Sequence, residues 1–146
     1  LFQTSKEITE KYAADGIKAY ISVNKALVTQ SSAAIPIVPL YISILYKVMK
    51  EKGVHEGCIE QMYRLFAEKF GADGKPVSGA VDGEGRIRLD DLEMKPEIQD
   101  EVTKLWNILN ADNFKEYTDI EGYWKDFYEL FGFGIDGVDY EADVEV

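Results

Sequence analysis

Apolar residues recur every three or four positions in five stretches of the chain, a spacing that places them on one face of an α-helix. These stretches predict helices over residues 5–15, 36–50, 56–70, 96–110 and 118–131. Capping-box pairs mark the first and last of these helices, Thr4 with Glu7 and Thr118 with Glu121. In the helix over 56–70, the face expected to pack into the core consists of Ile59, Met62, Tyr63, Phe66 and Phe70.

Strand signals are fewer than helix signals. Apolar and polar residues alternate over 17–23, which predicts one strand because successive side chains of a strand point to opposite faces. The glycine-rich segment 71–92 predicts a surface loop with a short strand or hairpin, inserted into a single segment that covers 1–146. The acidic, alternating tail 137–146 predicts an edge strand. The whole pattern predicts an α/β fold, mostly helical in this chain, with one or two strands and a small hairpin.

An uncharged stretch at 26–46 separates the predicted strand from the second predicted helix. The strand is followed by a polar loop and then by an apolar helix. Ligands of open α/β sheets bind at such loops, beyond the carboxyl ends of the strands. The stretch therefore predicts part of a ligand site. A membrane span needs about 20 consecutive apolar residues, and only 33–46 qualifies here, so no span is expected.

The charge balance narrows the classes of partner. The chain carries 27 acidic and 16 basic residues, a formal net charge of −11, without a separate basic stripe. Nucleic acid is excluded as a partner because binding to phosphates requires such a stripe. The single cysteine, Cys58, permits no internal disulfide, and residues 1–11 carry no secretion signal, so a cytoplasmic protein is expected.

Three motifs resemble binding sites but fit structural roles better. Residues 132–137 match G-x-G-x-x-G, yet they follow a predicted helix where a dinucleotide fingerprint follows a strand. Residues 82–93 resemble a calcium loop, but Arg86 stands where an oxygen ligand is needed and Ile87 where the turn needs glycine. His55 is the only histidine, so no multi-histidine metal site is available and no metal is expected.

One apolar stripe has two possible roles. In a helix over 36–50, Val38, Ile42 and Tyr46 lie four residues apart and share one face. The opposite face is apolar as well, so periodicity favours core packing and leaves the lining of a cavity as the alternative.

Four sequence words resemble a known family. They are LVTQSSAAIPIVPLY, YKVMKEKGVHEGCIEQMYRLF, EGRIR and LFGFGIDGVDYEADV. They resemble the carboxyl-terminal part of the NADH-dependent trans-2-enoyl-CoA and enoyl-acyl-carrier-protein reductases of the FabV type. The resemblance implies the last third of a Rossmann-type NAD-binding enzyme, which transfers a hydride from NADH to the β-carbon of an enoyl thioester in fatty acid synthesis.

The resemblance also implies site residues. Leu27, Val28 and Thr29 match the nicotinamide loop of the family; the alternative for Thr29 is a helix N-cap. Positions that line the acyl pocket match Val38, Ile42, Tyr46 and Tyr123, and some relatives carry phenylalanine where Tyr46 stands. The catalytic Y-x8-K pair of the family lies upstream of the matched region. Tyr41 and Lys50 have the same spacing, but nine residues of helix turn through about 900° and point them to opposite sides.

Without the upstream catalytic residues, we expect the chain to be inactive alone. Loss of neighbouring strands would expose apolar surface, so the chain is expected to associate with its own amino-terminal part or with itself. Its substrate would be an enoyl-CoA or an enoyl-acyl-carrier-protein. The alternative function is a non-enzymatic, acidic helical module that binds another protein.

Overall fold

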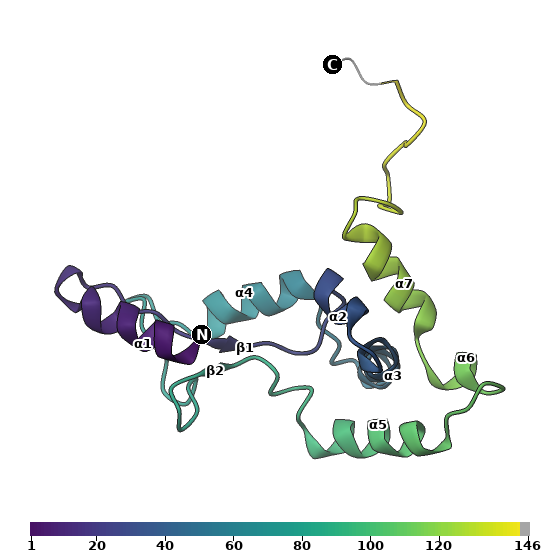
Figure 1. Ribbon diagram of the computed structural model, residues 1–146, viewed down its shortest axis with the longest axis horizontal. Coiled ribbons are helices and arrows are strands. Elements are labelled where there is room, and N and C mark those ends of the chain that lie inside the picture. The colour runs from purple at the N-terminus through teal and green to yellow at the C-terminus, as the bar shows by residue number, and fades with distance from the viewer. Residues whose placement is uncertain (144–146) are drawn as a thin grey trace. The chain divides into compact units, whose positions relative to one another are not determined.

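Helices dominate the described part of the chain, residues 1–143, in this computed structural model (Figure 1). The elements in chain order are α1 (Phe2–Lys11), the 3-10 turn η1 (Ala13–Asp15), β1 (Ser22–Val23), α2 (Gln30–Ala34), α3 (Val38–Glu51), α4 (Cys58–Glu68), β2 (Ile87–Arg88), α5 (Pro96–Ile108), α6 (Phe114–Tyr117) and α7 (Ile120–Glu129). The predicted mostly helical α/β content is confirmed.

Contacts divide the chain into two compact units, each made from two separate stretches of sequence. The first unit contains residues 1–26 and 56–96, and the second contains residues 27–55 together with residue 97 onward. Each unit has its own buried residues, and each is described by itself below. The prediction of one continuous segment stays a prediction.

The first unit is built on a short parallel pair of strands. Ser22 of β1 pairs with Ile87 of β2, and Val23 pairs with Arg88 (Figure 1). The predicted strand over 17–23 was too long, because a strand forms only where a neighbouring backbone supplies hydrogen bonds. Here β2 supplies them at one end: the Ile87 N–H donates to the Ile21 carbonyl and the Leu89 N–H to the Val23 carbonyl, each at 2.8 Å.

Helix α4 has the reverse of its predicted orientation. Gln61 and Arg64 are buried, at 0% and 9% exposure, whereas Ile59, Tyr63 and Phe66 are at least 70% exposed. Polar partners within the unit explain this reversal. The Gln61 side-chain oxygen accepts from the Lys25 N–H at 2.9 Å, and Arg64 donates to Glu56, Asp91 and the Leu89 carbonyl, each at 2.7 Å.

The segment 71–92 contains the expected turns and strand β2, together with antiparallel bridges from Phe70 to Pro76 and from Val81 to Ile87. The Asp82 carboxylate closes one turn by accepting the Glu84 and Arg86 N–H groups at 2.9 Å and the Arg86 guanidinium at 2.8 Å. These bonds lower the pKa of Asp82 to about 2, with the Arg86 backbone bond as the largest cause. The segment also supplies Ile87 and Leu89, both fully buried.

Helix α3 forms the centre of the second unit. Ile42, Ile44, Leu45, Tyr46 and Met49 have no exposed surface. The helix begins at Val38, two residues later than predicted, with Pro39 in the first turn, where a missing N–H costs no hydrogen bond. Pro36 precedes the helix, and α2 forms a separate short helix before it.

Helix α7 contacts α3 through its start and one face. The Asp119 N–H donates to the Ser43 carbonyl at 2.8 Å, and the Asp119 carboxylate caps α7 by accepting the Gly122 N–H at 3.1 Å. The predicted Thr118–Glu121 box was wrong by one residue, because Thr118 donates its hydroxyl to the Phe114 carbonyl.

The two ends of the chain also differ from the sequence pattern. Helix α1 begins at Phe2, so Thr4 lies inside it and caps nothing. Residues 137–143 form turns and irregular structure in place of the predicted edge strand, whose last residues, 144–146, lie outside the described chain.

The three glycines of the G-x-G-x-x-G match, at 132, 134 and 137, have φ between 72° and 82°, so turns require them. Among the described residues, no helix combines the length and the apolar character that a membrane span requires.

Candidate functional site

The loop Leu27–Thr29 is held in place by one serine. The Ser32 hydroxyl accepts the Thr29 N–H at 2.8 Å and donates to the Leu27 carbonyl at 2.9 Å. In return, the Thr29 hydroxyl accepts the Ser32 N–H at 3.0 Å, which makes Thr29 the N-cap of α2. Thr29 itself is exposed, so its hydroxyl hydrogen can still donate to a ligand.

The same loop is tied to α3 by Tyr46. The Val28 N–H donates to the Tyr46 hydroxyl oxygen at 3.4 Å, and Tyr46 has no exposed surface. The Asp126 carboxylate of α7 acts on the Tyr46 phenol through its negative charge, which helps to raise the pKa of that phenol. Burial, followed by the charge of Asp126, raises the pKa of Tyr46 far above its ordinary value, so the phenol keeps its proton.

The other predicted pocket residues occupy two different environments. Ile42 is fully buried and Tyr123, on α7, is 2% exposed, so both belong to the core of the second unit, as Tyr46 does. Val38 is half-buried and lines a separate cavity of about 330 Å³ between α3 and α5. The structure therefore brings the loop and Tyr46 together, and it places Val38 at an open cavity.

That cavity is lined by side chains that the sequence analysis did not assign to a site. Tyr41, Val102 and Trp106 line it, and Gln99 donates to the Tyr41 hydroxyl at 3.2 Å. The signal for Trp106 was present in the helical spacing of α5, but periodicity alone does not separate a cavity wall from a core. Tyr41 contacts α5, whereas Lys50 donates to Asp119 at 2.6 Å, so the Tyr41–Lys50 spacing does not bring the two together, as predicted.

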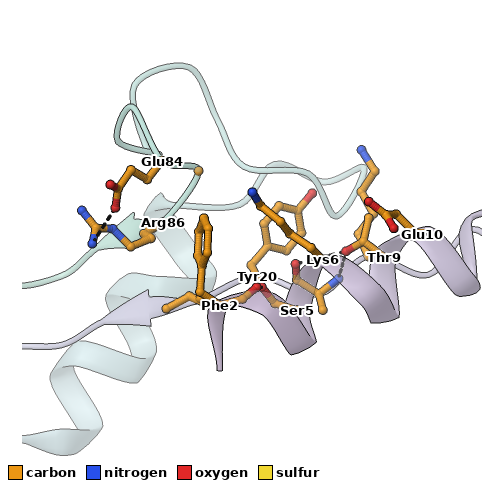
Figure 2. A pocket seen from close by; sticks show the side chains of 12 residues that line it. Phe2, Ser5, Lys6, Thr9, Glu10, Tyr20, Glu84 and Arg86 are labelled. Atoms are coloured by element: carbon orange, nitrogen blue, oxygen red, sulfur yellow. Dashed lines mark hydrogen bonds and ion pairs between the residues drawn. The ribbon is translucent and has the colours of Figure 1, made fainter.

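A second cavity, of about 400 Å³, lies in the first unit and contains none of the predicted site residues (Figure 2). Several of its polar side chains interact within the protein. Arg86 pairs with Glu84 at 2.9 Å, the Thr9 hydroxyl accepts the Ala19 N–H at 3.0 Å, and the Lys6 ammonium lies 4.4 Å from the centre of the Phe2 ring. These interactions are structural and assign no ligand to the cavity.

Comparison with known proteins identifies the family. The model of the trans-2-enoyl-CoA reductase catalytic region matches residues 1–70, and the model of the enoyl reductase FAD binding domain matches residues 81–144. The trans-2-enoyl-CoA reductase [NADH] of Ruminiclostridium cellulolyticum is 57% identical over 98% of the chain. The chain belongs to the trans-2-enoyl-CoA reductase family.

Two further relatives agree with this family. The enoyl-[acyl-carrier-protein] reductase [NADH] of Coxiella burnetii is 54% identical over the whole chain and 36% of its own length. A solved Clostridium trans-2-enoyl-CoA reductase in complex with NADH is 49% identical and aligns with a TM-score of 0.88 over 99% of this chain and 36% of that one.

The resemblance seen in the sequence is thereby confirmed, and so is its partial extent. The chain spans about 35% of the length of the R. cellulolyticum reductase. The family assignment gives no role to single residues, so the roles of Leu27, Val28, Thr29, Val38, Ile42, Tyr46 and Tyr123 stay predictions.

Proposed function

We propose that the chain forms one part of an NADH-dependent enoyl-thioester reductase, and that this part supplies the nicotinamide loop and a wall of the acyl pocket. The identity of 57% across 98% of the chain to a trans-2-enoyl-CoA reductase [NADH] is the observation that carries the proposal. The reaction would transfer a hydride to the β-carbon of the enoyl thioester, with a proton added at the α-carbon. The enoyl group would be presented on CoA or on acyl carrier protein.

The loop has groups that suit a nicotinamide carboxamide. A carbonyl oxygen accepts two hydrogen bonds, and the Leu27 carbonyl accepts one from Ser32, so it can accept a second from the carboxamide NH2. The exposed Thr29 hydroxyl can donate to the carboxamide oxygen. When bound, NADH supplies the hydride, and the loop residues would orient its ring toward the substrate.

The acyl pocket would use the apolar surface of α3 and α7. Val38 would line that pocket at the cavity beside α5, and the buried side chains of Ile42, Tyr46 and Tyr123 would support its wall from behind. A wall already packed without a ligand keeps its shape, which favours a defined acyl length.

The rest of the reductase would supply the chemistry. The resemblance implies a proton-donating tyrosine and its lysine upstream, and β1 with β2 would join the parallel sheet of a Rossmann-type NAD-binding fold. Cys58 is a free, exposed cysteine, which fits a reducing compartment. A cytoplasmic location is therefore part of the proposal.

A chimera tests this proposal. The chain replaces its matching segment in the R. cellulolyticum reductase, and NADH oxidation is followed with crotonyl-CoA. We expect the chimera to retain turnover and the isolated chain to show none, because the predicted catalytic pair lies outside it. Turnover by the isolated chain would refute the placement of the chemistry, and an inactive but folded chimera would refute the function.

The exposed face of α4, defined by Ile59, Tyr63 and Phe66, is the proposed contact with the rest of the reductase. The three side chains are 77%, 73% and 70% exposed, and buried Arg64 holds the helix with this face outward. Large exposed apolar patches mark interaction sites. The matched relatives have nearly two thirds of their length outside the region shared with this chain. That remaining part of the reductase is the proposed partner that would cover this face.

Co-expression tests this contact. The chain is produced with the remainder of the R. cellulolyticum reductase, and we expect the two polypeptides to co-purify. Tyr63→Asp with Phe66→Asp should abolish co-purification, because each carboxylate would lose its hydration at the contact. Lys104→Asp on α5, at a side chain 65% exposed, is the matched control and should have no effect. Self-association of the chain at this face, without binding to the remainder, would contradict the assignment.

The alternative function, a non-enzymatic interaction module, makes a different prediction for the same experiments. Such a module would bind through the exposed face of α4 and would leave the chimera without NADH-dependent turnover. The two functions are therefore separated by turnover.

A further inference from the structure

The cavity between α3 and α5 has an uncharged lining. Val38 and Tyr41 belong to its α3 wall, and Thr103 and Trp106 to its α5 wall. None of the described residues that line it is charged, although 29% of the chain is. Such a lining favours a hydrocarbon chain over a phosphate or a carboxylate, because an unpaired charge would lose its hydration there. Its volume of about 330 Å³ suits a small apolar ligand.

The backbone of Ile37 has an unusual conformation at this cavity. Its φ of 73° lies in the left-handed region, where a β-branched residue is rare, and Ile37 is the one non-glycine residue with positive φ in the described chain. Its carbonyl accepts the Tyr41 N–H at 3.0 Å as α3 begins. The turn lets Ile37 and Val38 line one cavity, whereas successive residues of a helix point about 100° apart. Strained backbone of this kind is concentrated at ligand sites.

A hydrogen bond joins the two walls of the cavity. The Gln99 amide of α5 donates to the Tyr41 hydroxyl of α3 at 3.2 Å. Val102 is 3% exposed, whereas Trp106 is 37% exposed and Ile37 is 66% exposed. Ile37 and Trp106 therefore offer apolar surface that a bound hydrocarbon chain would remove from water.

We propose that this cavity receives the distal end of the acyl chain, and that Thr103 and Trp106 of α5 determine the chain length that fits. The inference rests on the proposed function and deepens it, because Val38 belongs both to the proposed acyl pocket and to this cavity. In this scheme a short enoyl chain ends before the cavity, and a longer chain continues past Val38 between α3 and α5.

Filling the cavity tests the inference in the chimera. Thr103→Phe adds a ring to the α5 wall, so the ratio of kcat/KM for trans-2-octenoyl-CoA to that for crotonyl-CoA should fall about tenfold, the effect of about one misfitting methylene. Lys104→Phe adds the same ring at the next residue, which is outside the lining and has a side chain 65% exposed. This control should leave the ratio unchanged. Equal falls in the two variants would overturn the inference.

Enlarging the cavity should have the opposite effect. Trp106→Ala extends the space between the walls, so the ratio of kcat/KM for trans-2-dodecenoyl-CoA to that for trans-2-octenoyl-CoA should rise about tenfold. Trp124→Ala on α7 removes an indole that is 46% exposed and outside the cavity, and it should leave this ratio unchanged. A lower melting temperature in Trp106→Ala without a change in the ratio would overturn the role of Trp106.

The indole N–H signals of the two tryptophans give an NMR readout that does not depend on turnover. Octanoyl-CoA added to the isotope-labelled chain should shift the Trp106 signal and leave the Trp124 signal in place, and CoA alone should shift neither. A Trp106 shift with free octanoate but not with octanoyl-CoA would overturn the assignment to a thioester.

The two readouts separate this inference from the proposed function. An inactive, folded chimera together with the Trp106 shift would refute the proposed function and support the cavity as an acyl site. An active chimera whose ratio does not respond to Thr103→Phe would overturn the inference and leave the proposed function intact.

Discussion

Replacing Arg64 by leucine is expected to destabilise the first unit by about 3 kcal/mol, because it leaves buried acceptors without their cation. The Arg64 guanidinium donates to Glu56, Asp91 and the Leu89 carbonyl, and its side chain is 11% exposed. Hydrogen exchange of the Ile87 and Leu89 amides measures the change, since both donate across the β1–β2 pair.

A neighbouring cation provides the control for Arg64. Lys69 pairs with the carboxylate of Asp91, whose side chain is 40% exposed. Lys69→Met should therefore lower the free energy of unfolding by less than about 1 kcal/mol. Equal protection of the two amides in Arg64→Leu and the original chain would contradict the inward orientation of α4. Arg64→Lys should lie between these limits, because an ammonium cannot reach all three acceptors.

Ile42→Ala is expected to destabilise the second unit by about 3 kcal/mol, the usual cost of a cavity at a fully buried position. Ile42 has no exposed surface and lies in α3, against which α7 packs. Both tryptophans, Trp106 and Trp124, belong to this unit, so urea unfolding followed by tryptophan fluorescence reports its stability.

Val38→Ala is the control for this substitution. Val38 is half-buried at an open cavity, so its truncation removes fewer contacts and should cost about 1 kcal/mol or less. Similar costs at both positions would mean that Ile42 also faces an open space when no ligand is bound. The stripe of Val38, Ile42 and Tyr46 would then be a cavity wall along its whole length.

The apolar periodicity of the sequence correctly predicted a helix wherever that helix buries an apolar face within the chain. Ile98, Val102 and Leu105 are buried as their spacing predicts, and α5 has nearly its predicted bounds. The prediction of α4 failed in orientation because periodicity shows which residues share a face, not which face turns inward. The decisive groups, Glu56 and Asp91, lie outside the helix, and the second is 27 residues from Arg64.

Part of the candidate site could also be predicted. The uncharged stretch placed the loop and the helix that follows it, and the N-cap alternative for Thr29 is what the structure shows. Asp126 was missed because a charged residue on an amphipathic helix normally faces solvent. One signal did exist: Asp126 follows Tyr123 by three residues, which places both on the side of α7 that packs on α3.

The measurement that tests the central claim most directly follows the hydride itself. The chimera is supplied with crotonyl-CoA and NADH carrying deuterium at C4, with each of the two C4 positions labelled in a separate reaction. The account predicts that one of the two labels appears at the β-carbon of butyryl-CoA, as seen by mass spectrometry and NMR. Product without deuterium at the β-carbon from either label, or no product from a folded chimera, would contradict it.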